Sequence, residues 1–458
     1  MIDAAPTKAK PGTAQVAQRF LSHYQARGYQ VIPGSSLLDP SVPMSFVMSA
    51  GLVQVETSAM SQGGRTGSRY TLLQNCFRYF DLEQVGNSQI HLSLFQMPGA
   101  FTFGPIDKAA HIEQIWSLLV DVYGLPPDRL WATWFAGDTV AGRAFDPDLE
   151  TRQAWLDVGL PGERIVGLGA GHNFWKQGAS VVGELHAPKC GPNTEVFFDR
   201  GEAYHCGPAC APGCRCGRFV EFLNTLFIST HLDEPSGRIA PLEEPFTETV
   251  VGAERIAMLL QGAASVFDID SIRPLVEHIR AWKREPCASG SLSMQHARVI
   301  ADHLRALLFL TADGAPPPGK GGRARLMRKL AREMFTAQKL MHIDDPAFVR
   351  SLVGRAVDLY SSRHAGLSSA SARLLANLDA ERDRFERALQ SGFRRLERLL
   401  TRRGYNQVSG EEMVQLEKEY GLPEPLLKAA LHRRQVDFDP RAYRTARKAW
   451  YQTMTGAD

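Results

Sequence analysis

The chain of 458 residues lacks several features that would assign it to other classes of protein. No apolar run approaches the roughly 20 residues that a membrane-spanning helix needs. The first residues, MIDAAPTKAKPGT, lack the apolar core of a signal peptide. We therefore expect a cytoplasmic protein that does not enter a membrane. Neither sign of charge dominates, since there are 52 basic and 49 acidic residues, so the composition does not by itself require a nucleic-acid partner.

Cysteine is scarce, and seven cysteines in a chain of this length do not suggest a disulfide scaffold. Four of them, Cys206, Cys210, Cys214 and Cys216, lie within eleven residues and directly after His205. Thiolates at such short spacings, separated by Gly and Pro, can surround one tetrahedral Zn²⁺ ion. Reduced free thiols are the less expected alternative, because exposed cysteine clusters rarely persist without a ligand. We predict a structural Zn²⁺ site formed by the four cysteines or by a set that includes His205.

The pattern of apolar residues predicts an α+β domain followed by an all-helical domain. Residues 1–12 are small and polar and are expected to be flexible. Residues 13–265 alternate helical and strand patterns, which predicts a sheet flanked by helices with a cysteine-rich insertion at 205–216. Residues 266–458 are helical in pattern, and the longest predicted helix, 368–403, has one apolar stripe and many arginines.

Two shorter segments lead to expectations about single elements. Tyr29 to Leu38 is apolar and short, which predicts a strand and a turn. Val250 to Leu260 follows a Thr-rich strand pattern and is expected to open a helix.

Two arginines stand where an anion could bind. Arg78 ends an apolar run within Tyr70 to Gly104, a segment that predicts two strands joined by a turn, and its planar fork of donors suits a phosphate. Arg255 follows Gly252 by three residues at a predicted helix start, where glycine allows close approach and the helix end favours anions. Taken alone, each motif is better explained by an exposed surface arginine.

Both arginines belong to an ordered series of sequence blocks that runs almost the whole length of the chain. In this order the blocks resemble the alanyl-tRNA synthetases, which are class II enzymes, with Arg78 in the family's motif 2 and Arg255 in its motif 3. The resemblance implies a class II antiparallel sheet flanked by helices and then a helical tRNA-recognition domain. The blocks are MSAGL, QNCFR, DLEQVG, FQMPGAFTFG, HNFWK, CGPNTEVFFD, RFVEFLN, GAERIAMLLQ, RVIADHLRAL, GRARLMRKLAR and EYGLP.

The resemblance implies an ATP site. Arg78 would bind the α-phosphate and oppose the charge that builds when an amino-acid carboxylate attacks phosphorus. Arg255 would hold the γ-phosphate and flank the adenine, on which Phe95 would stack, and Mg²⁺ would bridge the phosphates. Met97 and Gly252 complete the ATP site that the resemblance implies. Outside this context, core packing is the simpler interpretation of Phe95.

The resemblance also implies an amino-acid pocket formed by Trp175, Asn224, Glu248 and Val250. Glu248 stands where the family has an aspartate that holds the substrate ammonium. Val250 and Val251 replace a glycine pair of the family, and their added methyl groups should shrink the pocket. We therefore expect a small amino acid, alanine above all.

Several departures from the family concern the acyl acceptor. The turn after Arg78 is shorter than in the family and lacks a basic residue, and we expect no editing domain after the helical domain. Lys418, and Lys320 or Gly322, replace an aspartate and an asparagine with which the family reads its tRNA, and lysine cannot accept a hydrogen bond from a base edge. Arginines of the helical domain could still contact tRNA phosphates, or could form a solvated face with Glu–Arg pairs.

Three hypotheses about function follow from these departures. The first is an ATP-dependent ligase that forms an aminoacyl adenylate and transfers the aminoacyl group to an atypical acceptor. That acceptor would be a small molecule, such as a nucleoside metabolite, or a carrier protein. The second is a minimal alanine–tRNA ligase without an editing domain. The third is a non-catalytic tRNA-binding or regulatory protein, which the retained Arg78, Arg255, Glu248 and Asn224 disfavour. Either a monomer or a dimer is compatible with the sequence.

Overall fold

The computed structural model describes most of the chain and divides it into two compact units, residues 1–274 and 275–458. The described residues are 10–39, 48–52, 55, 67–177, 188–233, 238–283, 290–403 and 407–455. The sequence-based boundary between domains, after residue 265, stays a prediction. No helix in these described ranges combines the length and the apolar character that crossing a membrane requires.

A nine-stranded sheet forms the centre of the first unit in the described part of the chain. Its strands follow the order β1-β2-β3-β11-β10-β9-β4-β7, and β8 also pairs with β9. The inner pairs are antiparallel, and β1–β2 and β4–β7 at the two edges are parallel. The bounds are β1 (Gln30–Val31), β2 (Arg69–Phe77), β3 (Leu94–Phe103), β4 (Leu130–Phe135), β7 (Ile165–Leu168), β8 (Phe174–Lys176), β9 (Lys189–Asp199), β10 (Phe219–Asp233) and β11 (Arg238–Val251).

The register of the inner strands aligns side chains across the sheet. Val250 of β11 lies opposite Gly99 of β3 on one side and opposite Asn224 of β10 on the other, and Asn224 lies opposite Glu195 of β9. Two residues further along each strand, a second row joins Phe101, Glu248, Leu226 and Asn193. Because successive side chains point to opposite faces, these two rows share one face of the sheet.

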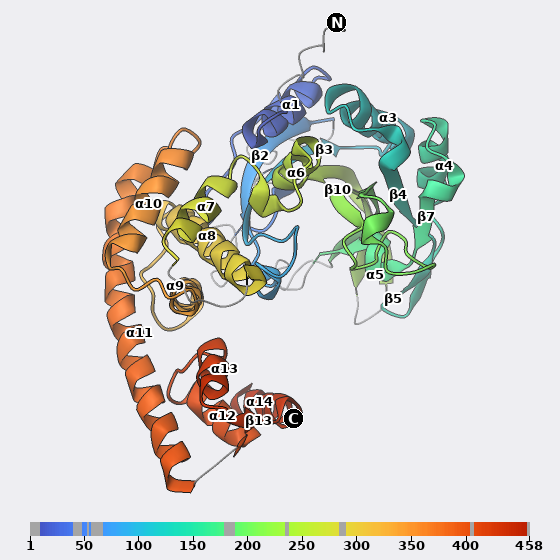
Figure 1. Cartoon of the computed structure of the whole chain (residues 1–458). Coiled ribbons are helices and arrows are strands. Elements are labelled where there is room, and N and C mark those ends of the chain that lie inside the picture. Colours follow the sequence, from blue (N-terminus) through green and yellow to red (C-terminus); the bar gives the residue numbers. More distant parts are fainter. Residues whose placement is uncertain are drawn as a thin grey trace, which may run out of the picture. The chain divides into compact units, whose positions relative to one another are not determined.

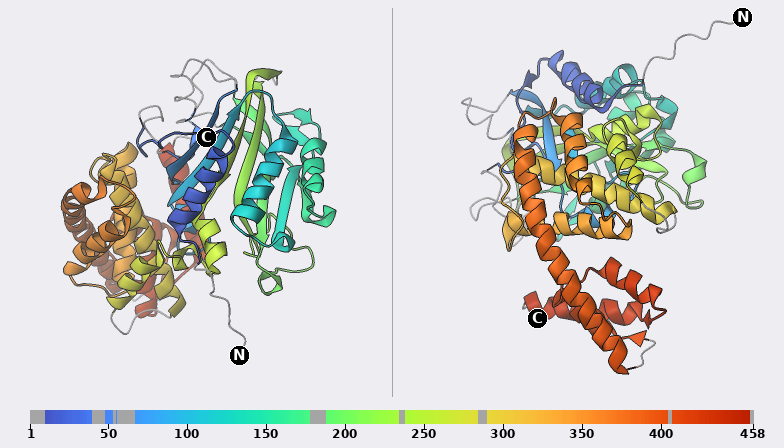
Figure 2. Two further views of the ribbon diagram at one scale, coloured as in Figure 1. Left: turned by 90° about the horizontal axis from the view of Figure 1, so that it is seen from above. Right: turned by 60° about the vertical axis from the view of Figure 1, so that its left-hand side comes forward.

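Helices cover the sheet of the first unit and close its core. Helices α1 (Thr13–Gln25) and α6 (Ala253–Gln261) contact each other, and both contact β3 (Figures 1 and 2). The other helices are α3 (Lys108–Ser117), which continues as a π-helical turn over Leu118–Val122, α4 (Leu149–Asp157) and α5 (Ala170–Asn173). A small hairpin pairs β5 (Asp138–Val140) with β6 (Arg143–Phe145). One apolar cluster of the core contains Ile32, Leu52, Val55, Tyr70, Leu72, Phe101, Phe103, Leu226, Ile228 and Phe246, and Trp175 packs against it.

The second unit is helical apart from one short strand pair in its described residues, and α11 is its longest element (Figure 2). With 37 residues, α11 is about 55 Å long. The buried carboxylate of Glu381 on α11 accepts hydrogen bonds from Arg332 of α9 at 2.6 Å and from Arg384 at 2.7 Å. The elements are α7 (Arg273–Ala281), α8 (Gly290–Ala312), α9 (Gly322–Leu340), α10 (Ala347–Tyr360), α11 (Leu367–Arg403), α12 (Gly410–Lys418), α13 (Glu424–Arg433), α14 (Pro440–Thr455) and the pair β12 (Gln407–Val408) and β13 (Asp437–Phe438).

The structure confirms the α+β class, with a sheet flanked by helices and a helical region after it. The strand and turn expected between Tyr29 and Leu38 are both present, as β1 (Gln30–Val31) and a turn at Leu37 and Leu38, and β1 is short because Pro33 has no N–H to donate to a neighbouring strand. The expected helix start at Val250 is wrong. Val250 and Val251 are the last residues of β11, where β-branched side chains fit the pleated surface, and α6 begins at Ala253.

Gly191 gives a test of the packing between β9 and β10. A Cβ atom at this position would lie 2.0 Å from the carbonyl oxygen of Phe227, so the substitution Gly191→Ala must push the two strands apart. We expect a loss of roughly 1–3 kcal/mol in the free energy of unfolding, measured by urea denaturation. Gly171→Ala is the control, because a Cβ there meets nothing within 4 Å. Equal stability of the two variants would contradict the close approach.

Candidate active site

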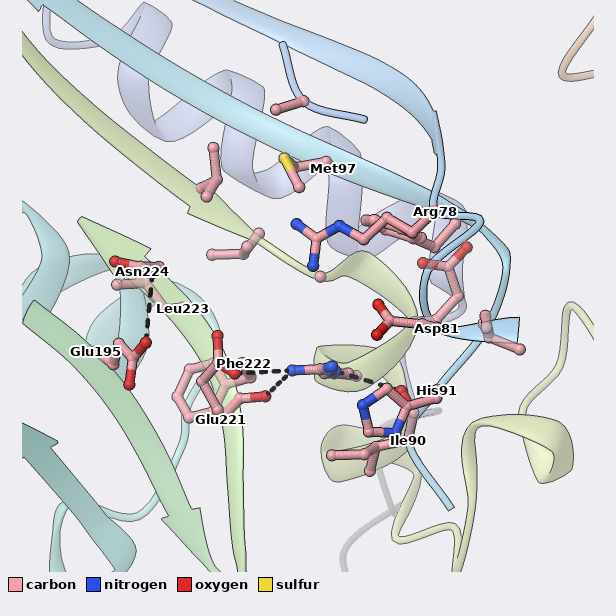
Figure 3. Close-up of a pocket in the computed structure, with 18 of the residues that line it drawn as sticks. Arg78, Asp81, Ile90, His91, Met97, Glu195, Glu221, Phe222, Leu223 and Asn224 are labelled. Atoms are coloured by element: carbon pink, nitrogen blue, oxygen red, sulfur yellow. Dashed lines mark hydrogen bonds and ion pairs between the residues drawn. The ribbon is translucent and has the colours of Figure 1, made fainter. Parts of the chain in front are cut away.

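A cavity of about 400 Å³ lies on the sheet face that carries the two rows of aligned residues. This volume is typical of sites for small molecules. The turn after β2, strands β3, β8, β9, β10 and β11 and the start of α6 all contribute to its wall (Figure 3). Every ATP and amino-acid residue expected from the sequence lines this one cavity, namely Arg78, Phe95, Met97, Trp175, Asn224, Glu248, Val250, Gly252 and Arg255.

Arg78 lies at one end of the cavity, directly after the last residue of β2. Its backbone N–H donates to the carbonyl of Ser93 at 2.9 Å, which continues the β2–β3 pairing by one step. Its guanidinium carbon lies 5.1 Å from the ring centre of Phe95 and 6.0 Å from that of Phe80. These cation–π contacts hold the guanidinium at the cavity, where Figure 3 shows it, while its planar fork of donors can pair with an anion.

Arg255 reaches the same cavity from the first turn of α6. Gly252 caps this helix, and its N–H donates to the carbonyl of Phe222 at 3.1 Å. The Arg255 side chain then crosses to β10, where Nη1 donates to the Glu221 carbonyl at 2.7 Å and lies 3.4 Å from the Glu221 carboxylate. Two arginines on separate elements therefore face one space that could hold a polyphosphate.

A β-bulge in β10 determines which side chains face the cavity. Glu221 pairs with Phe197 and Leu223 pairs with Val196, so Phe222 is an extra residue on β10. In a regular strand Glu221 and Asn224 would point to opposite faces, because their positions differ by an odd number. The extra residue brings Glu221 to the face of Glu195 and Asn224, as bulges near sites often do (Figure 3).

Glu195 is a carboxyl group with an unusual proton affinity. Burial raises its pKa from 4.5 to about 8; the neighbouring Glu221 adds to the rise, and Arg255 opposes it. Asn224 donates its amide to Glu195 at 3.5 Å and accepts a hydrogen bond from Asn193 at 3.1 Å. The carboxyl groups of Glu195 and Glu221 therefore face one cavity. Burial and their mutual repulsion disfavour the ionised form of both at the same time.

The rows of aligned residues also form a small compartment. Glu248 is only 3% exposed, and it lines the cavity together with Trp175 of β8 and Asn224. Val250 packs over Gly99, since a Cβ atom at Gly99 would lie 3.4 Å from Cγ1 of Val250. A buried carboxylate beside an amide and a valine suits a small molecule that carries an ammonium group.

Several cavity residues were not singled out from the sequence. Asp81, His91, Glu195, Glu221 and Glu254 all line the cavity. Glu254 accepts the Gln96 N–H with both oxygens at 3.1 Å. Burial, followed by the charge of Arg255, lowers the pKa of His91, whose Nδ1 lies 2.7 Å from Ser88 Oγ. The available signal for Glu195 and Glu221 was an acidic residue directly beside apolar residues of a strand, in TEVFF and FVEFL.

The cysteine residues gather outside this cavity. The Sγ atoms of Cys206, Cys210 and Cys216 all lie within 4.8 Å of one another, and the side chain of Cys214 is within hydrogen-bonding reach of Cys206. His205 is not among the grouped ligand atoms, and its Nδ1 accepts the N–H of Gly207 at 3.0 Å.

Comparisons with known proteins agree with the geometry. The family model "tRNA synthetases class II (A)" matches residues 15–455. An alanine–tRNA ligase of Thermoanaerobacter sp. (strain X514) is 30% identical over 439 residues, which is 95% of this chain and 48% of that protein. One from Leptospira biflexa is 31% identical over 440 residues, or 94% and 45%. The chain thus spans about half the length of the curated relatives it matches.

Solved structures match at lower similarity. A histidyl-tRNA synthetase of S. aureus is 13% identical, with a TM-score of 0.33 over 61% of this chain and 81% of that chain. A pyrrolysyl-tRNA synthetase of Desulfitobacterium hafniense is 10% identical, with a TM-score of 0.31 over 58% and 74%. The fold assignment therefore rests on the sheet topology and the family model.

The raised pKa of Glu195 predicts a pH dependence of stability. Between pH 4.5 and about 8 the folded protein holds a proton on Glu195 that the unfolded chain releases, so stability falls as pH rises through this window. Glu195→Gln removes this dependence, and its stability relative to the parent should rise from pH 5 towards pH 8, measured by urea denaturation. Glu202→Gln, at an exposed carboxylate, is the control. A difference between parent and Glu195→Gln that does not change with pH would contradict the assignment.

Proposed function

Since the chain belongs to the class II tRNA synthetases, in the alanyl-tRNA synthetase family, we propose that it activates alanine with ATP and transfers the alanyl group to tRNA. The observation that carries this proposal is the convergence in one cavity of two arginines, Arg78 and Arg255, with the buried carboxylate of Glu248. Cations at one end suit phosphates, and an anion at the other suits an ammonium group.

In the proposed reaction the alanine carboxylate oxygen attacks the α-phosphorus of ATP. The new bond is an oxygen–phosphorus bond, the α–β phosphoanhydride bond breaks, and pyrophosphate leaves. Arg78 stabilises the negative charge on the α-phosphate oxygens as it builds, and Phe95, which already packs on Arg78, supports the adenine. Arg255 and the capping Gly252 bind the far phosphates, and Met97 contributes to the wall of the ATP site.

The carboxyl groups Glu195 and Glu221 fit a bound Mg²⁺ ion. Oxygen donors are the ligands that Mg²⁺ prefers, and the two carboxyl groups line the same cavity. When bound, the ion would neutralise phosphate charge during the displacement. The structural Zn²⁺ expected from the cysteines would lie outside this cavity, so it takes no part in the proposed reaction.

The proposed alanine subsite is formed by Glu248, Asn224, Trp175 and Val250. Glu248 holds the substrate ammonium, and the Asn193 contact fixes the orientation of the Asn224 amide. Val250 lies on the floor against Gly99 and limits the side chain to a methyl group. Discrimination by such a wall is worth about 1–3 kcal/mol per methylene.

Transfer RNA is the acceptor that the relatives favour, because the matching curated proteins are named alanine–tRNA ligases. The expectation of a small-molecule acceptor finds no support among them. The Nζ atom of Lys418 lies 2.7 Å from the carboxylate of Glu417 and 2.8 Å from the hydroxyl of Tyr451, beside the ring of Trp450. Lys418 thus joins α12 to α14. This packing role explains the lysine, so its presence is not evidence for an acceptor other than tRNA.

Only some arginines of the helical unit are exposed and not engaged by Glu381, and these are the candidates for contacts with tRNA phosphates. Arg332 and Arg384 are engaged by the buried Glu381, so they stabilise the packing of α9 and α11. Arg325, Arg394 and Arg398 are exposed, and we assign tRNA phosphate contacts to these residues.

Alanine-dependent exchange of pyrophosphate into ATP tests the adenylation step. The parent should catalyse exchange with alanine, and Arg78→Ala should reduce the rate by about 100-fold or more, as does loss of one charge-stabilising donor elsewhere. Arg69→Ala is the matched control, since Arg69 lies on the same strand and outside the cavity lining. Nearly normal exchange by Arg78→Ala would contradict its role. No exchange with any amino acid would leave the non-catalytic alternative.

The acceptor is tested separately with labelled alanine. We expect acid-stable, ribonuclease-sensitive label on total tRNA, and weaker labelling by a variant in which Arg325, Arg394 and Arg398 are all alanine. A variant with alanine at exposed Arg143 and Arg152 of the first unit controls for the loss of charge. Label on free nucleosides but not on tRNA, with exchange intact, would overturn the tRNA proposal and restore the small-molecule hypothesis.

A further inference from the structure

The connection between β9 and β10 contains a cluster of thiols that the proposed reaction does not use. This cysteine segment, residues 201–218, brings the Sγ atoms of Cys206, Cys210 and Cys216 within 4.8 Å of one another. The Sγ atoms of Cys210 and Cys216 are 3.5 Å apart. Thiolates bound to Zn²⁺ at about 2.3 Å in a tetrahedron lie ~3.8 Å from one another. The three sulfur atoms are therefore already near the spacing of a tetrahedral site.

Cys214 is the best candidate for the fourth ligand. Its side chain is within hydrogen-bonding reach of Cys206, and its Sγ lies outside the group of three sulfur atoms that are all within 4.8 Å of one another. The Cys214 Sγ also accepts the backbone N–H of Ala211 at 3.5 Å, and such donors stabilise a metal-bound thiolate. Backbone turns bring the chain back at Cys210 and Cys214, with N–H donation to the carbonyls of Gly207 and Ala211 at 3.0 Å each.

His205 does not have the geometry of a ligand. Its Nδ1 accepts the N–H of Gly207 at 3.0 Å, so this nitrogen already has a donor. No atom of His205 falls within the group formed by the sulfur atoms among the described residues. The geometry groups three sulfur atoms and no imidazole, with Cys214 next to Cys206 as the candidate for the fourth ligand.

The cysteine segment has almost no apolar core of its own. Between Gly201 and Arg218, Pro212 is the one described residue that is buried, and the others are exposed or half-buried. A segment that buries so little apolar surface needs a cross-link to hold one conformation, and metals and disulfides are the usual ones. The described cysteines are all free thiols, which leaves a metal as the cross-link that fits.

We propose that Cys206, Cys210, Cys214 and Cys216 bind one Zn²⁺ ion as four thiolates, and that this ion fixes the end of the β9–β10 pair. Four soft sulfur donors in a tetrahedral arrangement select zinc over harder cations. All four positions are filled by protein, so the ion has a structural role. The proposal does not depend on the identity of the reaction in the cavity.

The site is mechanically connected to the strands that carry the cavity carboxylates. At the base of the segment, Arg218 donates to both oxygens of Asp199 at 2.8 Å, which joins the last residue of β9 to the start of β10. The segment also rests on α5, since a Cβ atom at Gly213 would lie 3.6 Å from the ring of His172. The zinc ion would therefore stabilise the region between Glu195 on β9 and Glu221 on β10.

Metal content of the full chain, purified under reducing conditions without chelator, tests the proposal. We expect one zinc per chain, no iron, and release of that zinc as four thiols react with a thiol-modifying reagent. Cys214→Ser should lower zinc affinity by more than the roughly 10–100-fold typical of losing a supporting contact. His205→Ala should keep one zinc, and Cys76→Ala, which removes a buried thiol of β2, should do the same. Chelation should lower the Tm of the parent.

Three outcomes would overturn the inference. The first is a zinc content near zero together with a disulfide between cysteines of the segment, found by mass spectrometry. The second is stoichiometric iron. The third is a loss of zinc in His205→Ala as large as that in Cys214→Ser, which would replace a thiolate by the imidazole. The thiol-release measurement on the parent protein decides the ligand number even where Cys214→Ser fails to fold.

Discussion

The register across β3, β11, β10 and β9 is the constraint on which the whole cavity depends. It aligns Gly99, Val250, Asn224 and Glu195 in one row and Phe101, Glu248, Leu226 and Asn193 in the next. Because side chains alternate along a strand, a slip of one residue in any of these pairings would turn one strand's contribution to the opposite face. The close approach of β9 and β10 at Gly191 and the packed cluster around Phe101 and Phe103 hold that register. Binding chemistry therefore depends on residues that touch no substrate.

The fold class and much of the cavity could be predicted from the sequence, because their signals are local or belong to recognisable blocks. Arg78 and Arg255 were found by the glycine, apolar and acidic residues around them, and the structure brings both to one cavity. Glu195 and Glu221 were missed as functional candidates, since the proximity of the two carboxyl groups depends on long-range pairing and on one bulged residue. The strand expected after Tyr29 is present, but its end at Val31 could not be predicted, because a short apolar run does not show how far a neighbouring strand pairs with it.

Arginines of the helical unit show a second limit of sequence interpretation. Arg325 and Arg332 belong to one stretch of α9 and look alike in composition. The first is exposed, whereas Nε of the second lies 2.6 Å from a carboxylate with no exposed surface. A buried carboxylate needs cationic partners, so Arg332 is committed to packing together with Arg384. Only the tertiary contact with Glu381 separates an arginine of the interior from one available to a polyanion.

The bulge at Phe222 has a consequence for how this sheet can change. Two residues of β10 separate Glu221 from Asn224, whereas one residue of β9, Val196, separates their partners Phe197 and Glu195. This difference of one residue sets the face that Glu221 occupies, whatever side chain stands at position 222. Substitution at position 222 preserves the bulge, and deletion of Phe222 would remove the bulge while leaving Glu221 two positions from Asn224 on the same face. Insertion of one residue between Val196 and Phe197 would match Phe222 across β9 and turn Glu221 away from Glu195. The presence of the Glu221 carboxylate in the cavity thus depends partly on the number of residues in β10 relative to β9. Point substitutions in β10 and single-residue insertions in β9 therefore change different properties of the protein.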